Sequence, residues 1–101
     1  MLKWLSSLFQ APDIEGYLSR DAVIVDVRSA GEFRSGHVPG SKNIPLNQIG
    51  QKTEAIKKWN KPVIACCRSG NRSGMAARRL QKAGIDVING GSWQNVHRFT
   101  R

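Results

Sequence analysis

The sequence predicts an α/β domain of three layers, in which helices flank a mainly parallel central sheet of four to five strands. Near-continuous β-branched and apolar residues at positions 22–27 and 62–66 suit strands that are covered on both faces. Helical patterns alternate with these runs, as is typical of parallel sheets with crossover helices. Shorter strand candidates lie at 85–88 and 43–45.

Four helices are expected between and before these strands. Residues 12–18 predict a short one, and Ser29 followed by Glu32 matches a capping box, which predicts a helix just after the first strand. A third helix is expected around residues 46–56, and a fourth over 72–83, where Gly84 would end it. The residues expected to point inward from the fourth helix are Met75, Ala76, Leu80 and Ala83.

The length of 101 residues fits one compact domain, which we place at residues 12–101. Residues 1–11 are expected to form an N-terminal helical extension, because Leu2, Leu5 and Phe9 recur at helical spacing. Docking of this extension on the domain is the preferred interpretation, and a membrane- or partner-binding anchor is the alternative. No apolar run reaches the roughly 18 to 20 residues needed to cross a bilayer, so no stable membrane insertion is expected.

The charge balance points to anionic partners. Sixteen Lys and Arg residues against seven Asp and Glu give a net charge of +9. The basic residues are scattered, without an aromatic-interleaved stripe or zinc-finger spacing, so we expect a small anion and not nucleic acid.

The two cysteines, Cys66 and Cys67, are adjacent and cannot join distant segments of the chain by a disulfide bond. A reducing compartment, the cytoplasm, is therefore expected. No His and Cys residues show metal-ligand spacing. Cys66 is expected to be buried in its strand, with the resolution of an oxidised or persulfidated Cys67 as the alternative.

The strongest functional signal is the loop after the second long strand. In parallel sheets sites form at the carboxyl ends of strands, and a turn into a helix makes a cradle of amides for an anion. A thiol so placed titrates at roughly 3.5 to 7.5 instead of about 8.5. The sequence therefore predicts Cys67 as a nucleophile, with Arg68 and Arg72 to hold an oxyanion. The loop comprises Cys67, Arg68, Ser69, Gly70, Asn71, Arg72 and Ser73.

This loop resembles the active-site loop of the rhodanese family, which runs from a catalytic Cys through a Gly to a basic or small residue. The stretches at 24–28, 32–33, 36–41 and 43–45 look like the first signature of that family, in order and spacing. Gly90 and Gly91 with Trp93 resemble its closing signature, although Trp93 lies only two positions after the glycine pair. The resemblance covers about residues 12 to 95 and implies a rhodanese-like fold. Packing is the preferred role for Trp93, and lining of the pocket is the alternative.

The resemblance also implies a mechanism. Cys67 thiolate would attack the outer sulfur of thiosulfate or a similar sulfane donor, expel sulfite and hold the sulfur as a persulfide among the loop amides. Arg68 and Arg72 would bind the sulfonate. Cyanide in assays, or a thiol or protein acceptor in the cell, would then collect the sulfur in a ping-pong cycle that needs neither metal nor organic cofactor.

Two other functions stay open at this point. A cysteine phosphatase or arsenate reductase places five residues between Cys and Arg, as Cys66 and Arg72 do, but Cys67 leaves only four, and Asp26 is the only well-placed general acid. A non-catalytic rhodanese-like interaction or sulfur-relay module is the other alternative. The retained cysteine and arginines argue against it.

Four further residues are expected to support the site. For Asp26 a structural role at the strand end is the preferred interpretation, and acceptance of hydrogen bonds from the loop amides, which would fix the cradle, is the alternative. Arg28 and Glu32, four residues apart, are expected to form a structural ion pair. His37 lies in a Gly-His-Val-Pro-Gly turn, where it is expected to stabilise the turn by a hydrogen bond and not to act as a base.

Overall fold

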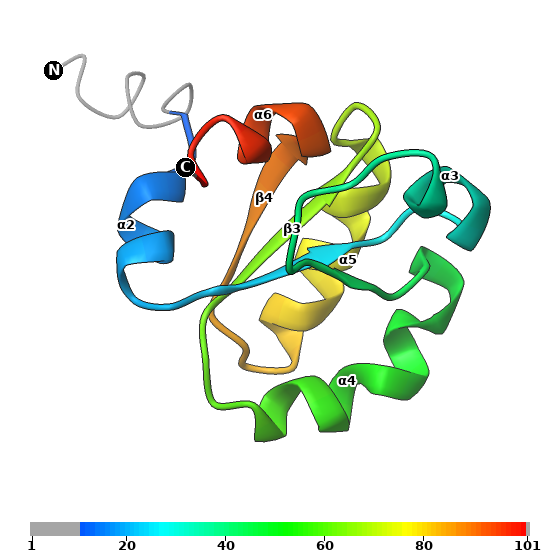
Figure 1. The fold of residues 1–101 in the computed structure, drawn as a ribbon. Coiled ribbons are helices and arrows are strands. Elements are labelled where there is room, and N and C mark those ends of the chain that lie inside the picture. The colour runs from blue at the N-terminus through cyan, green and yellow to red at the C-terminus, as the bar shows by residue number, and fades with distance from the viewer. Residues whose placement is uncertain (1–10, 101) are drawn as a thin grey trace, which may run out of the picture.

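The structure is a computed structural model that describes residues 11–100. Its centre is a four-stranded sheet in the order β2-β1-β3-β4, and every neighbouring pair is parallel. The predicted α/β fold with a parallel central sheet is confirmed (Figure 1). The strands are β1 (Val23–Asp26), β2 (Lys42–Asn43), β3 (Val63–Cys67) and β4 (Val87–Ser92).

The helices occupy the segments between the strands. They are α2 (Ile14–Ser19), α3 (Ala30–Arg34), the 3-10 turn η1 (Leu46–Gln48), α4 (Ile49–Lys58), α5 (Asn71–Lys82) and α6 (Trp93–His97). The capping box of α3 is confirmed, since Ser29 and Glu32 bond each other's backbone amides. Gly84 follows the end of α5 with φ +87°, a conformation that favours glycine, which confirms the predicted stop.

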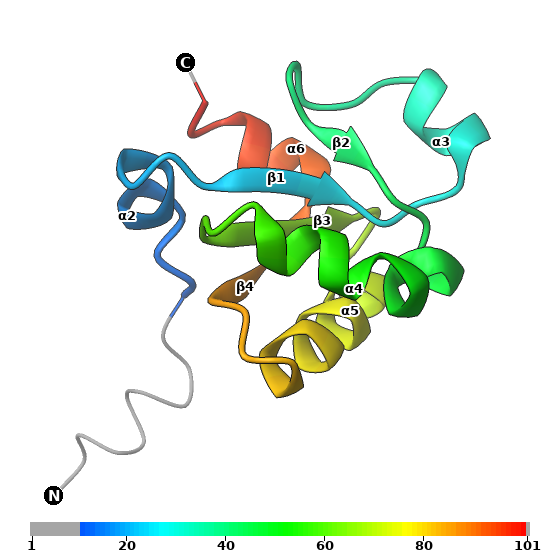
Figure 2. The ribbon, with the colours of Figure 1, turned by 90° about the horizontal axis from the view of Figure 1, so that it is seen from below.

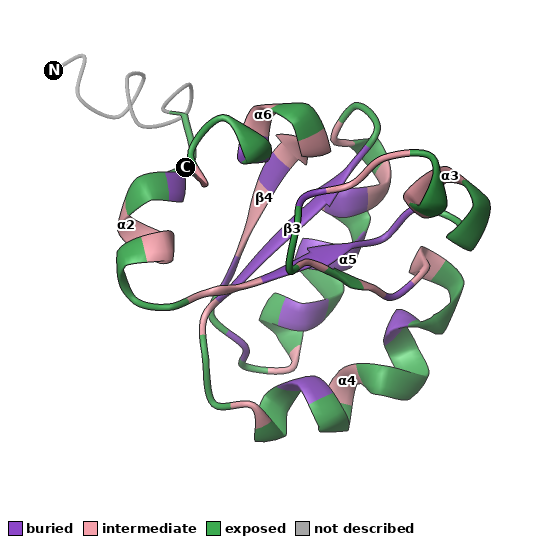
Figure 3. Cartoon of the chain, in the orientation of Figure 1, coloured by how far each residue is buried: buried purple, intermediate pink, exposed green. Residues whose placement is uncertain are grey.

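Two apolar layers cover the sheet. Side chains of successive strand residues alternate between the faces, so Val25, Ala65 and Cys67 share a cluster with α4 and α5. Ile24 and Cys66 belong to the opposite cluster, with residues of α2 and α6. Figure 2 shows the sheet between its two layers of helices. Figure 3 shows that many of the buried residues lie on the strands. Because of this alternation, Cys66 and Cys67 face opposite sides of the sheet.

The structure corrects two predicted elements. The strand predicted at 85–88 lies at Val87–Ser92 and includes the glycine pair. Gly90 packs so closely in this strand that a Cβ on it would come within 2.6 Å of Val96 Cγ2. Met75 was expected to point inward but is 39% exposed. The buried side of α5 consists instead of Ser73, Ala76, Ala77 and Leu80, and the helical period places Met75 opposite them.

The predicted N-terminal helical extension falls on residues that the structure does not describe, apart from residue 11. Among the helices between residues 11 and 100, none is long and apolar enough to span a bilayer.

Candidate active site

The Cys67 sulfur lies in a cradle made by the start of α5. Cys67 is the last residue of β3, so its side chain meets the turn at the carboxyl end of the sheet. Its Sγ accepts hydrogen bonds from the backbone N–H of Gly70 at 3.0 Å and of Ser73 at 3.4 Å, and lies 3.2 Å from Ser73 Oγ. Such donors stabilise a negative charge on sulfur. The predicted anion cradle is therefore formed, and in this structure the sulfur itself occupies it.

The two adjacent thiols differ in acidity. Burial raises the pKa of the Cys67 thiol, but hydrogen bonds from Ser73 and from the loop amides of Gly70 and Ser69 outweigh it and bring that pKa below its ordinary value. Burial and the nearby Asp26 carboxylate raise the pKa of Cys66 to about 12. Of the two thiols, Cys67 therefore has the lower pKa, and the expected burial of Cys66 in its strand is confirmed.

Asn89 on β4 holds the cradle in shape, a role that was not predicted from the sequence. Its Oδ1 accepts hydrogen bonds from Ser73 Oγ at 2.7 Å and from Gly91 N–H at 3.0 Å, while its Nδ2 donates to Gly70 O at 3.0 Å. One side chain therefore ties together the loop, the start of α5 and the glycine turn. The signal available in the sequence was an amide residue just before the glycine pair at the carboxyl end of a strand.

Gly70 is required by the shape of the loop. It adopts φ +103° immediately before α5, and a Cβ there would lie 3.4 Å from Gly91 Cα. Side chains other than glycine are strained at such positive φ values. Gly70 thereby allows its own N–H to point at the Cys67 sulfur.

The two arginines of the loop have different environments. Arg68 is exposed and forms no ion pair with any residue from 11 to 100. Arg72 forms a two-pronged pair with Glu32, at 2.7 Å from Nη1 to Oε1 and 3.0 Å from Nη2 to Oε2. Glu32 was expected to pair with Arg28. The capping box turns its carboxylate toward the start of α3, where Arg72 meets it.

The structural role preferred for Asp26 is confirmed, and the alternative, in which it accepts hydrogen bonds from the loop amides, is not. Its carboxylate instead accepts from the backbone N–H of Arg28 at 3.0 Å and from the Arg28 guanidinium at 2.7 Å. The reason is strand alternation, since Asp26 pairs in register with Cys66 and both side chains lie on the face away from Cys67. Asp26 and Arg28 are a buried structural pair, and Asn43 fixes the same strand end by donating to the carbonyls of both.

The remaining residues of the predicted site have framework roles or lie at its surface. His37 Nδ1 bonds Phe33 O at 2.7 Å, and the two rings stack, which confirms its turn-stabilising role. Trp93 packs on Gly36 and under the Arg28 guanidinium, which confirms packing as its role. Ser69 and Asn71 are exposed on the loop.

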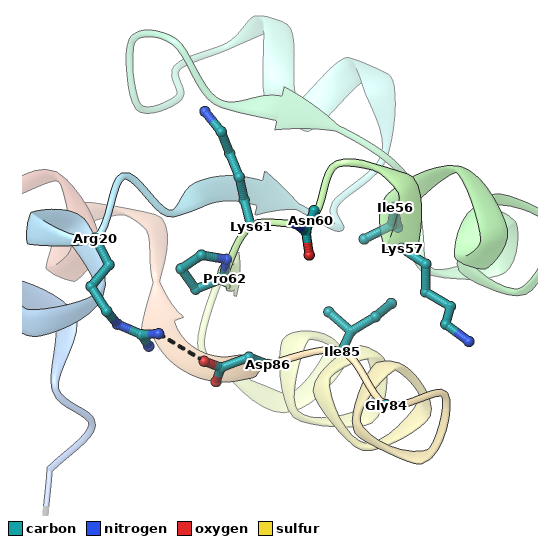
Figure 4. A pocket seen from close by; sticks show the side chains of 9 residues that line it. All are labelled: Arg20, Ile56, Lys57, Asn60, Lys61, Pro62, Gly84, Ile85 and Asp86. Carbon is teal, nitrogen blue, oxygen red and sulfur yellow. Dashed lines mark hydrogen bonds and ion pairs between the residues drawn. The ribbon is translucent and has the colours of Figure 1, made fainter.

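A separate hollow lies at the amino ends of β3 and β4, the opposite edge of the sheet from Cys67 (Figure 4). Three of its four charged residues are engaged in structural contacts: Arg20 bonds Asp86 at 3.0 Å, and Lys61 bonds Asp21 at 2.7 Å. Tyr17 also donates to Asp86. These pairs join α2 and the following turn to the segments just before β3 and β4. We therefore assign these contacts a structural role and not a role in binding a ligand.

Comparison with known proteins identifies the family. A family model described as a rhodanese-like domain matches residues 1–97. The chain belongs to the rhodanese family. This rhodanese domain is 45% identical over 69 residues to the uncharacterized protein YqhL of Bacillus subtilis, a match that covers 68% of this chain and 54% of YqhL. It is 39% identical over 65 residues to YrkF of Bacillus subtilis, provisionally named a sulfur carrier protein, covering 64% of this chain and 35% of YrkF.

A solved structure agrees with these relatives. The chain superposes on a rhodanese with anions from E. coli with a TM-score of 0.66 and 30% identity, covering 73% of this chain and 89% of that one. The chain spans about half the length of YqhL and about a third of YrkF. Together these relationships support a role in sulfur transfer.

Proposed function

We propose that this rhodanese domain is a sulfurtransferase that carries sulfane sulfur as a persulfide on Cys67. The observation that carries the proposal is the pair of amide donors around Cys67 Sγ, from Gly70 and Ser73, with the Ser73 hydroxyl oxygen 3.2 Å away. These donors favour the thiolate, which is the nucleophilic form of cysteine. Once sulfur is added, the outer sulfur of the persulfide takes over the negative charge and the same amides are available to it.

In the first half-reaction the Cys67 thiolate attacks the outer sulfur of thiosulfate or a similar donor. A new S–S bond forms, the sulfur–sulfur bond of the donor breaks, and sulfite departs with the electron pair. Exposed Arg68 meets the sulfonate as it arrives. Arg72 is paired with Glu32, so the sulfonate has to compete with that carboxylate for the Arg72 guanidinium.

In the second half-reaction a thiolate or cyanide attacks the outer sulfur of the persulfide and releases the Cys67 thiolate. The cycle is ping-pong and uses neither metal nor organic cofactor. The similarity to YrkF, provisionally named a sulfur carrier protein, supports passage of the sulfur on to an acceptor. Because the cycle relies on a free thiol, a reducing compartment such as the cytoplasm suits it.

The position of Asp26 argues against the phosphatase alternative, which needs a general acid near the catalytic cysteine. Asp26 was its candidate for protonating the leaving alcohol, but the carboxylate is buried, bonded to Arg28 and directed to the opposite face from Cys67. Sulfite is a good leaving group and needs no such acid. A purely protein-binding module is opposed by the amide donors around Cys67 Sγ, which lower the pKa of that thiol.

The test is to load the reduced protein with thiosulfate, remove the excess and measure the intact mass and the modified peptide. We expect one added sulfur atom on Cys67 that cyanide removes as thiocyanate. Cys66→Ser should load normally, and Cys67→Ser should not load. Sulfur on Cys66, or none on a demonstrably free Cys67, would overturn the proposal; hydrolysis of a phosphate ester that depends on Cys67 would favour the phosphatase.

A further inference from the structure

The charges of this domain are unevenly distributed along the chain. Residues 55–85 contain eight Lys and Arg and no Asp or Glu. Two of these eight, Lys61 and Arg72, form ion pairs with acidic residues outside the stretch, and the other six form none with residues 11–100. The region that contains Cys67 and α5 therefore carries a net positive charge.

Much of this charge lies on the outward side of α5. The buried side of the helix is lined by small and apolar residues, and the helical period places Met75, Arg78, Arg79 and Lys82 on the opposite side. All four are exposed, line a shallow hollow, and form no ion pair with residues 11–100. We name these four residues the α5 basic face.

The α5 basic face begins next to the Cys67 loop. Met75 lies two residues after Ser73, whose amide contacts the sulfur. Arg78 extends back toward the start of the helix, with Nη1 3.9 Å from the position of a Cβ on Gly74. Exposed Arg68 continues the positive charge on the loop itself. A macromolecule on this face is thus placed to bring a reactive group to the cradle.

The composition of the face favours a protein over a nucleic acid. Met75 gives it an apolar centre surrounded by cations, and methionine adapts to varied protein surfaces. Single-stranded nucleic acids are usually held by aromatic side chains on which bases stack, and α5 contains none. A negatively charged protein meets both features, through steering by charge and contact with Met75.

We propose that the α5 basic face docks an acidic, thiol-bearing protein that receives sulfur from Cys67. The inference rests on the proposed function. The acceptor thiolate attacks the outer sulfur of the Cys67 persulfide, a new S–S bond forms on the acceptor, and the Cys67 thiolate leaves. No oxidant or reductant is consumed, because sulfane sulfur is only passed on.

The experiment uses persulfide-loaded protein and two synthetic peptides. Each contains one cysteine, flanked in one peptide by Asp and Glu and in the other by Asn and Gln. The rate of persulfide formation on each peptide is followed by alkylation and mass spectrometry. We expect the acidic peptide to react about tenfold faster at low salt, and the advantage to vanish at about 1 M salt, where charges are screened within about 3 Å.

Two double variants with equal change of charge locate the effect. Arg79→Glu with Lys82→Glu should abolish the preference for the acidic peptide. Lys57→Glu with Lys58→Glu, on exposed positions of α4, should retain most of it. Cyanide should remove sulfur from both at similar rates, which shows that the cradle is intact.

Equal rates for the two peptides, or an equal loss in both double variants, would overturn the inference. So would binding of a single-stranded oligonucleotide to the α5 basic face without any preference for the acidic peptide. Failure of Cys67 to load sulfur at all is a different result and would instead refute the proposed function.

Discussion

The Ser73 hydroxyl donates a hydrogen bond of 2.7 Å to Asn89 Oδ1, while its oxygen lies 3.2 Å from Cys67 Sγ. A hydroxyl has a single proton. While that proton is directed to Asn89, the oxygen can accept from a Cys67 S–H. When Cys67 is a thiolate, the hydroxyl can turn to the sulfur, and Gly91 N–H still satisfies Asn89 Oδ1. The three side chains thus accommodate both protonation states without leaving a buried polar group unpaired.

Asn89→Ala is therefore expected to lower the reactivity of the Cys67 thiol, although the Asn89 side chain bonds only to residues around it. The change removes the partner of Ser73 Oγ, of Gly91 N–H and of Gly70 O, so the donors around the sulfur lose their fixed positions. The pKa of Cys67 should rise, and sulfur loading near neutral pH should slow about tenfold, because a hydrogen bond to a charged group is worth roughly 1.5 to 3 kcal/mol. The measurement is the pH profile of thiol alkylation together with the loading rate.

Gln81→Ala is the matched control for that variant. It also removes a bond between α5 and β4, from Gln81 Nε2 to Val87 O at 3.1 Å, but away from the loop. Its pH profile should equal that of the unmodified protein. An unchanged profile in Asn89→Ala would show that Asn89 has no influence on the thiol.

The opposite shifts of the two thiols predict selective alkylation. Near neutral pH iodoacetamide should label Cys67 at least about tenfold faster than Cys66, because a cysteine reacts as the thiolate and the pKa of Cys66 is raised to about 12. Peptide mapping over time measures both rates. Cys66→Ser should leave the labelling of Cys67 unchanged; equal labelling of the two cysteines would contradict the assigned roles.

The fold was predictable because its signals are local. The β-branched runs at β1 and β3, the capping box of α3 and the stop at Gly84 each depend on a few adjacent residues, and each is confirmed. The position of Cys67 at a strand-to-helix turn follows from the same local pattern.

The contacts that complete the site were not predictable from those patterns. Arg72 and Glu32 are 40 residues apart, and Ser73 and Asn89 are 16 apart, so their pairing depends on how the helices and strands pack. The sequence left two roles open for Asp26, because the face on which its side chain lies depends on the alternation of strand side chains and on the register with β3.

Glu32→Gln is expected to improve binding of the sulfur donor. Glutamine can still cap α3, but it gives up the charge that holds Arg72. The freed guanidinium should attract the sulfonate, so the KM for thiosulfate should fall about threefold to tenfold, in the range of an interaction of about 1 kcal/mol. Ser29→Ala, which removes the cap and leaves the ion pair, should not lower KM. A rise in KM in Glu32→Gln would mean that Glu32 orients Arg72 for the substrate.

Glu32 should also affect the stability of the protein in acid. The bond from Arg72, followed by the bond from Ser29 N–H, lowers the pKa of Glu32 from 4.5 to about 2. A lowered carboxyl pKa contributes stability above the ordinary value and loses it as pH falls toward the folded value. The difference in Tm between the unmodified protein and Glu32→Gln should hold from neutral pH to about pH 5 and shrink between about pH 4.5 and 2. A constant difference down to pH 2 would refute the ion pair as its source.

Gly70→Ala and Gly50→Ala should have opposite effects on stability. Gly70 has φ +103° and lies against Gly91, so alanine should cost about 1 kcal/mol or more and displace the N–H that bonds Cys67 Sγ. Gly50 lies in α4 with no atom within 4 Å of an added Cβ, and alanine there should stabilise the protein by about 0.5 to 1 kcal/mol. Urea denaturation measures both changes, and the loading rate should fall only in Gly70→Ala. If Gly70→Ala loaded sulfur at the normal rate, the amide of residue 70 would not be needed to hold the thiolate, and the Ser73 donors alone would account for the acidity of Cys67.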